Sequence, residues 1–122
     1  MSEAYETGSK GETLLRDYLE RLGRKVEESD RKTFDLRVDG EYAEVKSSKA
    51  PYSKLGFIEL TSNQFNALND GLEFILFIVC NLNDPENLEV IEIPASRLLT
   101  EQPTVERKYY WYRGQLERLR SF

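Results

Sequence analysis

The sequence predicts an α/β fold in which helices flank one mixed sheet, and three observations support this. Leucines recur at helical spacing over residues 9–22, just before Gly23. Two strand-like runs surround Asp39-Gly40, a dipeptide that favours a two-residue hairpin turn. Residues 74–80 are apolar at every position, which is typical of a central strand covered on both faces.

The first part of the chain should contain one helix followed by a short strand. Residues 1–7 are polar and are expected to fray. The helix over residues 9–22 should end at Gly23, because glycine readily adopts the left-handed conformation that closes a helix. A short strand is expected at residues 24–27. The buried stripe of the helix is expected to contain Leu15, Leu19 and Leu22.

Glu12 lies in phase with this stripe, three residues before Leu15. Its carboxylate is therefore expected to point toward the rest of the fold. The alternative is a glutamate in the first turn of the helix that is favoured by the helix dipole.

The hairpin over residues 33–46 brings two carboxylates together. The turn at Asp39-Gly40 sets a register that pairs Val38 with Glu41, Leu36 with Ala43, and Asp35 with Glu44. Carboxylates that face each other across a ladder repel, and a divalent cation between them would offset this cost. Lys46 is two residues beyond Glu44 and should project from the same face. Two carboxylates and an ammonium group on one patch suggest metal-assisted hydrolysis.

The remaining elements complete an α/β sandwich around a mixed sheet. Thr61 is a suitable helix cap, and the all-apolar stretch supplies the central strand. The expected elements are a basic loop at 47–54, a strand at 57–60, a helix from Thr61, strands at 73–81 and 88–93, a turn at 83–85 and a short helix from Pro94. The tail, with four aromatic residues at 109–112, should end in a strand or a helix. The predicted order is α-β-β-β-α-β-β-α.

The composition narrows the possible chemistry. The chain has 122 residues, which suits a single domain over residues 1–122. It contains no histidine, which excludes histidine as a general base and every Ser-His or Cys-His scheme. The single cysteine, Cys80, lies in the apolar stretch and is expected to be a buried small hydrophobe. No apolar run is long enough to span a membrane, and the N-terminus does not resemble a signal peptide, so a cytoplasmic protein is expected.

Charge is distributed unevenly along the chain. The net charge of −5 argues weakly against a nucleic-acid partner. Residues 55–104 carry −7, residues 24–54 carry +1, and residues 105–122 carry +3. A locally positive face is therefore compatible with an acidic protein. Ordinary solvated surface charge would explain the same pattern.

The order of these charged residues resembles the signature of the PD-(D/E)xK nuclease superfamily. The helix motif reads Gly8-Ser9-Lys10-Gly11-Glu12, the lone aspartate is Asp35, and the acidic-x-Lys triplet is Glu44-Val45-Lys46. The likeness is strongest to the Holliday-junction-resolvase and Mrr-like branches, and residues 57–65 resemble the NO VEIN C-terminal-type domain. It covers about residues 8–93 and leaves 94–122 as a C-terminal extension. Phe34 stands where the family has a variable, non-catalytic proline.

The resemblance implies a restriction-endonuclease-like fold and a Mg²⁺-dependent endonuclease that acts on DNA, with Mn²⁺ able to substitute. In this family likeness, Asp35, Glu44 and the Val45 carbonyl would bind the metal. Glu12 would hold the metal through water or bind a second metal. Lys46 would orient or activate the attacking water and contact the scissile phosphate.

The resemblance also implies supporting residues and an assembly. Gln64 would support the site, as a glutamine does in Mrr-like members. Lys49 and Lys54 would contact the nucleic-acid backbone. A homodimer that cuts two strands is a further expectation, because one small domain covers little of a duplex.

Each of these residues also has a less specific explanation. Asp35 and Glu44 could be solvent-facing strand residues, Lys46 an edge charge that deters aggregation, and Gln64 a capping or surface residue. The aromatic run at 109–112 could stack nucleobases, although packing is the commoner role. Two other functions remain open: a catalytically weak or inactive nuclease-fold domain that binds nucleic acid or protein as a subunit, and a plain α/β interaction domain without a site.

Overall fold

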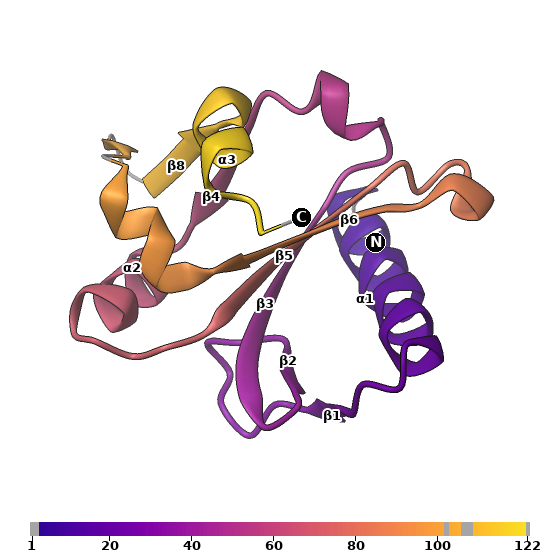
Figure 1. Cartoon of the computed structure of the whole chain (residues 1–122), viewed down its shortest axis with the longest axis horizontal. Coiled ribbons are helices and arrows are strands. Elements are labelled where there is room, and N and C mark those ends of the chain that lie inside the picture. Colours follow the sequence, from indigo (N-terminus) through magenta and orange to yellow (C-terminus); the bar gives the residue numbers. More distant parts are fainter. Residues whose placement is uncertain (1–2, 102, 106–108, 122) are drawn as a thin grey trace.

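Two sheets of different size organise the fold, which a computed structural model describes for residues 3–101, 103–105 and 109–121 (Figure 1). The helices are α1 (Glu3–Arg21), α2 (Ser62–Asn69) and α3 (Arg113–Leu119), with 3-10 turns η1 (Tyr52–Lys54), η2 (Pro85–Asn87) and η3 (Ala95–Thr100). The strands are β1 (Val26–Glu28), β2 (Leu36–Val38), β3 (Glu41–Ser47), β4 (Phe57–Leu60), β5 (Ile75–Cys80), β6 (Glu89–Pro94), β7 (Thr104–Val105) and β8 (Tyr109–Tyr112). The protein is therefore mixed α/β, as the sequence predicts.

The larger sheet has five strands in the order β1-β2-β3-β5-β6. Neighbouring strands run antiparallel except β3 and β5, which are parallel. A parallel pair needs a long crossover, and residues 48–74 supply it through η1, β4 and α2. In Figure 1, α1 covers one face of this sheet, and α2, β4, β8 and α3 lie on the other side. The predicted mixed sheet with flanking helices is confirmed.

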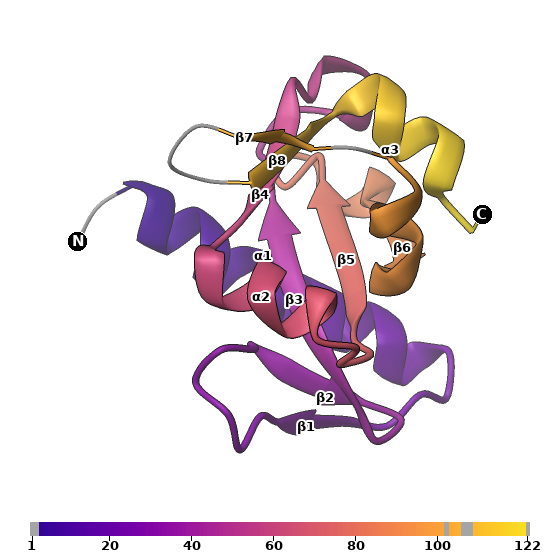
Figure 2. The same cartoon turned by 90° about the vertical axis from the view of Figure 1, so that its left-hand side faces the viewer.

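A second sheet of three strands, in the order β4-β8-β7, corrects the prediction of a single sheet. β4 does not join the larger sheet. It pairs antiparallel with β8 from the C-terminal tail, with Ile58 opposite Trp111 and Leu60 opposite Tyr109, and Figure 2 shows the three strands stacked above α2. The apolar pattern of β4 marks it as a strand, but a strand pattern does not identify a partner so far along the chain.

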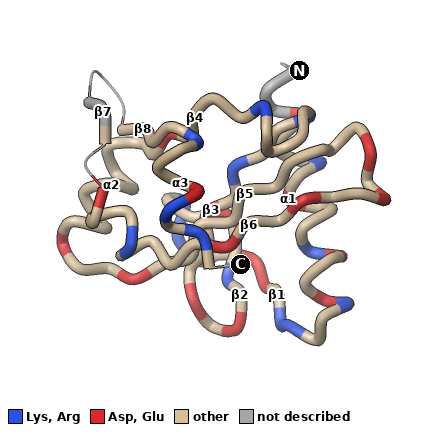
Figure 3. Tube along the Cα trace, turned by 45° about the horizontal axis from the view of Figure 1, so that its top comes forward, with Lys and Arg blue, Asp and Glu red and all other residues tan. Residues whose placement is uncertain are grey.

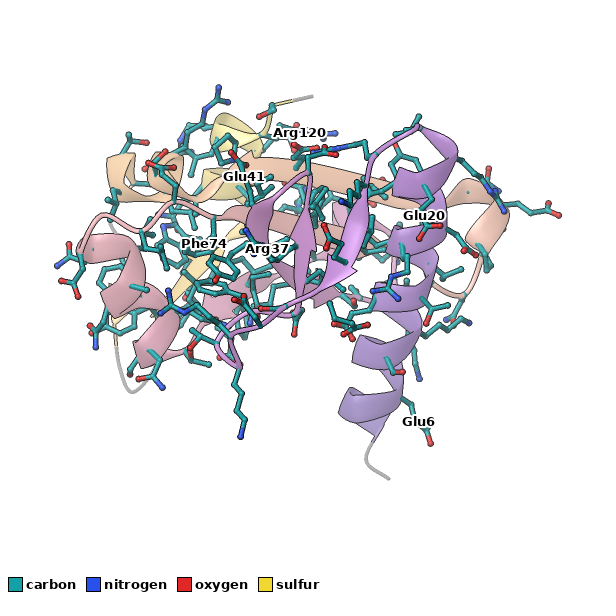
Figure 4. The ribbon with its side chains drawn as sticks, turned by 90° about the horizontal axis from the view of Figure 1, so that it is seen from below. Glu6, Glu20, Arg37, Glu41, Phe74 and Arg120 are labelled. Atoms are coloured by element: carbon teal, nitrogen blue, oxygen red, sulfur yellow. The ribbon has the colours of Figure 1, made fainter. Side chains whose placement is uncertain are left out.

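Two hydrophobic clusters lie on opposite faces of the larger sheet. Alternate residues of β5, such as Phe77, pack with Leu15 and Leu19 of α1. The residues between them, such as Leu76, pack with the elements on the other side, which include Trp111. We call these elements, α2, η3, β4, β8 and α3, the second layer. All of β5 is therefore buried, as its apolar sequence predicts. Figure 4 shows this layering from below, with Arg37 of the hairpin between Phe74 and the helix that carries Glu20.

Helix α1 begins earlier than predicted. It starts at Glu3 rather than at residue 9, so residues 3–7 are helical instead of frayed, and residues 1–2 lie outside the described residues. Leu15 and Leu19 are buried, whereas Leu22 is 61% exposed, because the helix ends at Arg21 before Leu22 can join the buried stripe. Gly23 has a φ of +81° and closes the helix in the left-handed conformation, as predicted.

The hairpin has the predicted register from the turn to Leu36, but Asp35 and Glu44 do not form the predicted ladder pair, because β2 begins at Leu36 and the Asp35 N–H donates to the Ala43 carbonyl at 3.1 Å. Val38 pairs with Glu41, and Leu36 pairs with Ala43. Asp39 and Gly40 have φ values of 51° and 86°, as a two-residue turn with both central residues left-handed requires. β1 begins at Val26 rather than at residue 24. At Lys25 the carbonyl accepts from the Asp39 N–H at 2.8 Å, but the Lys25 N–H donates to the Asp39 carboxylate at 3.0 Å and not to a backbone carbonyl.

Cys80 is fully buried, and burial raises the pKa of its thiol to about 12. The thiol therefore stays protonated and behaves as a small hydrophobe, as predicted. In the described ranges, no helix is both long enough and apolar enough to cross a membrane.

Candidate active site

Asp35 lies where β2 separates from β3. Its backbone N–H donates to the Ala43 carbonyl at 3.1 Å. Its side chain then turns back onto β3, where Oδ2 accepts a hydrogen bond from the Val45 N–H at 2.9 Å. The amide and the carbonyl of a strand residue point toward the same neighbouring strand, so the Val45 carbonyl also faces the side that β2 has left. Asp35 and Val45 thus present oxygen atoms on the same side of β3.

Glu44 is an ionisable side chain inside the fold. It is only 5% exposed, and it faces the second layer because its neighbours Ala43 and Val45 pack toward α1. Lys46 Nζ lies 3.0 Å from Glu44 Oε2, which confirms that the two side chains share one face. Glu44 Oε1 is buried and has no hydrogen-bond donor among the described residues. Leaving a buried carboxylate oxygen without a donor is costly, so a proton or a cation is expected there.

The pKa of the Glu44 carboxyl is raised to about 8. Burial is the largest cause, the neighbouring Asp35 carboxylate contributes, and the Lys46 ammonium group opposes the rise. A proton shared between the two carboxyl groups would give Glu44 a partner, whereas two ionised carboxylates would repel each other. A bound divalent cation would instead favour the ionised forms of both residues.

Helix α1 brings Glu12 toward the same end of the hairpin. Gly11 is buried, and a Cβ atom at this position would collide with the Ser47 side chain, lying 2.7 Å from its Cβ. Glycine therefore allows α1 to approach the end of β3 closely. Burial raises the pKa of the Glu12 carboxyl, and the Asp35 and Glu28 carboxylates add to this effect. Glu12 lines a groove of about 220 Å³ between α1 and strands β1 and β2.

Asp35 interacts with predicted site residues from both faces of the sheet. Its charge raises the pKa of Glu12 and of Glu44. Glu12, however, comes from the helix on one face of the sheet, whereas Glu44 and Lys46 project from the other face. Within the part of the chain that the structure describes, no three acidic or cysteine side chains already form a group that could hold a metal ion. The predicted ligands are therefore neighbours at the end of the hairpin rather than a preformed cage.

Gln64 supports the loop that precedes Asp35. It is 5% exposed and forms a capping box with Thr61, with hydrogen bonds of 3.1 and 3.2 Å between each side chain and the other's N–H. Its Nε2 also donates to the Thr33 carbonyl at 3.0 Å. Both hydrogen bonds of the Gln64 side chain go to backbone atoms, so Gln64 contacts the backbone of the loop before Asp35 and not a carboxylate.

The predicted lysines follow one another along the chain from β3 to η1. Lys46 lines a hollow of about 200 Å³ together with Phe57 and Ile78. Lys49 and Lys54 are exposed on the connection that follows, and Lys54 ends η1. Figure 3 shows acidic and basic residues interleaved along the trace, with both signs on α1. Two basic residues of the tail, Arg107 and Lys108, lie outside the described residues.

Sequence reasoning did not associate Ser47 and Phe57 with the site. Ser47 packs against Gly11, the residue that precedes Glu12 in sequence. Phe57 lines the hollow that contains Lys46. Ser47 directly follows the acidic-x-Lys triplet in sequence, and this adjacency could have identified it. No sequence signal was available for Phe57, because the pairing of β4 with β8 brings it there.

Comparisons with known proteins do not assign the chain to a family. No protein-family model matches it, and neither the curated proteins nor the solved structures contain a significant match. The molecule is thus defined as a mixed α/β protein in which a buried glutamate pairs with a partly buried lysine on the second strand of a hairpin. Its function must be inferred from that site and not from the fold alone.

Proposed function

We propose that this protein is a metal-dependent endonuclease that hydrolyses phosphodiester bonds in DNA, with a restriction-endonuclease-like core of the PD-(D/E)xK type. The order of elements supports this core: α1, the antiparallel strands β1–β3, then a crossover that contains α2 and leads to β5, parallel to β3. Glu12 lies on α1, Asp35 immediately before β2, and Glu44-Val45-Lys46 on β3. The resemblance requires a helix followed by two neighbouring strands, and the three motifs lie on or beside such elements.

The environment of Glu44 is the observation that carries the proposal. One carboxylate oxygen pairs with Lys46 at 3.0 Å, and the other is buried without a donor among the described residues. The Asp35 carboxylate is close enough to raise the Glu44 pKa. A position with only a structural role would be more stable with an apolar residue. Hydrolysis assisted by a metal ion, in contrast, needs two carboxylates and a cationic group together.

The residues fit a hard divalent cation. Asp35, Glu44 and the Val45 carbonyl would hold Mg²⁺, or Mn²⁺ in its place, because all three are oxygen donors. When bound, the metal would lower the pKa of a coordinated water and offset charge on the phosphate. Lys46 would orient the attacking water and contact the scissile phosphate. Glu12, from the other face of the sheet, would act on the metal through water.

Cleavage assays test this proposal directly. The purified protein should nick plasmid, branched or single-stranded DNA in Mg²⁺ or Mn²⁺ and should leave it intact in EDTA. Lys46→Ala and Asp35→Asn should each lower the rate by about a hundredfold or more, because each removes a charge that stabilises the transition state. Lys25→Ala is the matched control, since the Lys25 side chain is 76% exposed and lies beside the turn at the far end of the hairpin.

Thermal melts should show that the three variants remain folded. The proposal is wrong if cleavage survives Lys46→Ala at the wild-type rate, or if cleavage is independent of added metal. Retained cleavage in Asp35→Asn would exclude the proposed metal ligand while leaving other acidic residues to be tested.

A nuclease-fold subunit that binds nucleic acid or protein but cleaves weakly or not at all is the second candidate. Two observations favour it: the described residues contain no preformed group of three acidic side chains, and the net charge is −5. In this case calorimetry should detect Mg²⁺ binding that Asp35→Asn abolishes, while no form of DNA or RNA is cut.

A further inference from the structure

The second sheet presents aromatic side chains on its outer face. Along β4 and β8, Ile58, Leu60 and Trp111 are buried in the core. The alternate positions place Phe57 opposite Tyr112, and Glu59 opposite Tyr110. Phe57 and Tyr112 are 49% and 50% exposed. The outer face therefore differs from that of an ordinary solvated strand pair, where polar residues alternate with the apolar ones.

The two exposed rings form a single cluster with the partly buried ring of Tyr110. The Phe57 ring lies 5.1 Å from that of Tyr110 and 6.5 Å from that of Tyr112, and the two tyrosine rings are 5.6 Å apart. The tyrosine rings are inclined at 83° to each other, so they do not cover one another face to face. We call Phe57, Tyr110 and Tyr112 the aromatic platform.

The aromatic platform adjoins the proposed active site. Phe57 lines the hollow of about 200 Å³ that also contains Lys46. This hollow is smaller than a typical ligand pocket, and its lining combines apolar residues with Lys46, Ser47 and Glu59. A nucleotide strand that reached Lys46 along this hollow would pass over Phe57.

Basic residues flank the aromatic platform. Arg113 directly follows Tyr112, and its N–H donates to the Gly56 carbonyl at 3.0 Å, which holds it beside the start of β4. Lys54 precedes Gly56 by two residues and is exposed. Cations beside exposed rings are the combination that binds single-stranded nucleic acid, because phosphates meet the cations while bases stack on the rings.

We propose that the aromatic platform binds unpaired nucleotides of the substrate by base stacking and delivers the adjoining phosphate to Lys46. The inference deepens the proposed nuclease function by assigning a substrate class: nucleic acid with a single-stranded segment beside the cleaved bond. Bases in a continuous duplex are stacked on each other and cannot offer their faces to the rings. The carboxylate of Glu59 on the same face also disfavours a purely electrostatic mode of binding.

Fluorescence anisotropy in EDTA tests the proposal without cleavage. The probes are a labelled single-stranded DNA of mixed sequence and a duplex of the same sequence. Exchanging both exposed rings in Phe57→Leu/Tyr112→Leu preserves apolar surface but removes the stacking faces. We expect about tenfold weaker binding of the single strand and less than a twofold change for the duplex. Tyr18→Leu, at an aromatic residue of α1 that is 39% exposed, should change neither.

The double variant should fold normally, because both rings are about half exposed, and its melting temperature and circular dichroism will show this. Phe57→Trp offers a larger stacking surface and should bind the single strand at least as tightly as wild type. Wild-type affinity for the single strand in the double variant would overturn the proposal. So would equal losses for single strand and duplex, or no single-strand binding by the wild type, which would instead assign this face to a protein partner.

Nicking assays on the same variants separate this inference from the proposed function. If ring removal abolishes the single-strand preference but no variant cleaves any DNA, single-strand binding by the aromatic platform is supported and the proposed nuclease activity is wrong. If nicking that depends on Lys46 persists while ring removal changes no affinity, the proposed nuclease activity is supported and the proposed role of the aromatic platform is wrong.

Discussion

Glu44 lies beside Leu76 in the larger sheet and is almost as buried as the apolar residues around it. Burial and the Asp35 carboxylate raise its pKa to about 8, and Lys46 only partly offsets them. A buried carboxylate in this state destabilises the fold when it ionises. Strong perturbation by burial and a specific neighbour is typical of functional sites, which is why this residue has more weight than the sequence motif alone.

The Glu44→Gln substitution should change how stability depends on pH. The folded-state pKa of about 8 lies above the ordinary value of 4.5, so the folded chain holds the proton more tightly than the unfolded chain. The resulting stabilisation is complete below about 4.5 and is lost as the pH rises through about 8. Without metal, the free energy of unfolding of Glu44→Gln should therefore be roughly 1–3 kcal/mol higher than that of the wild type at pH 9. Near pH 4 the two free energies of unfolding should be equal.

Urea denaturation in EDTA at the two pH values measures this difference. Added Mg²⁺ should recover part of the wild-type loss at pH 9, because it binds the ionised folded form. An identical difference between the two proteins at both pH values would show that Glu44 does not titrate as described.

Gln64 joins the start of α2 to the loop that precedes Asp35. Gln64→Ala removes the hydrogen bond that its side chain accepts from the Thr61 N–H and the one that it donates to the Thr33 carbonyl, whereas Thr61→Ala removes the other half of the capping box, the bond from the Gln64 N–H to the Thr61 hydroxyl. Both should lose about 1 kcal/mol of stability from capping. Only Gln64→Ala should also weaken Mg²⁺ binding, because the loop that carries Asp35 loses its support. Calorimetric titration measures Mg²⁺ binding by both variants. Equal Mg²⁺ affinities would show that Gln64 acts only as a capping residue.

At the scale of elements, the contact between α1 and β3 decides where Glu12 lies. Gly11 packs directly on Ser47, the last residue of β3. Gly8, one turn earlier on the same helix, has nothing within 4 Å of the position that a Cβ would occupy. The two glycines therefore separate the effect of helix propensity from the effect of close packing.

Gly11→Ala should destabilise the protein by about 1–3 kcal/mol, because the added methyl group overpacks the α1–β3 contact. Gly8→Ala should be neutral or should stabilise the helix by up to about 1 kcal/mol. Ser47→Gly in the Gly11→Ala background should restore part of the loss, which a double-mutant cycle in urea would measure. Equal effects of the two alanine substitutions would mean that α1 does not approach β3 at Gly11.

At the scale of the whole molecule, the C-terminal extension is part of the core. Leu98, Trp111 and Leu116 are fully buried and pack in the same cluster as Leu76 of the larger sheet. Trp111 Nε1 also donates to the Glu101 carbonyl at 3.2 Å. The second layer thus shares one apolar cluster with the larger sheet and cannot be removed without exposing it.

Unfolding should therefore be a single cooperative transition. Trp111 is the only tryptophan in the sequence and reports on the second layer, while helical circular dichroism reports mainly on α1. The two signals should follow the same urea curve, with one midpoint. Separate midpoints would show that the layers unfold independently and that the tail is an appended unit.

Local sequence signals were sufficient to predict the hairpin, the end of α1 and the all-apolar strand β5. Asp39-Gly40 defines the turn, and the turn defines the register that brings Asp35 near Glu44. Gly23 closes α1, and continuous apolar sequence predicts a strand buried on both faces. Each of these features depends on backbone preferences or on side-chain alternation within a few residues, so the sequence contains them directly.

Long-range pairing decided the rest. β4 joins β8 in a second sheet, Phe57 reaches the hollow beside Lys46, and Glu12 approaches from the face opposite to Glu44. The side chain of Glu44 is polar in sequence, yet the second layer covers it and changes its pKa. Residue type and spacing thus identify the charged groups of the candidate site. Their burial, mutual distance and access to solvent depend on which distant segments pack over them, and only the folded chain determines that.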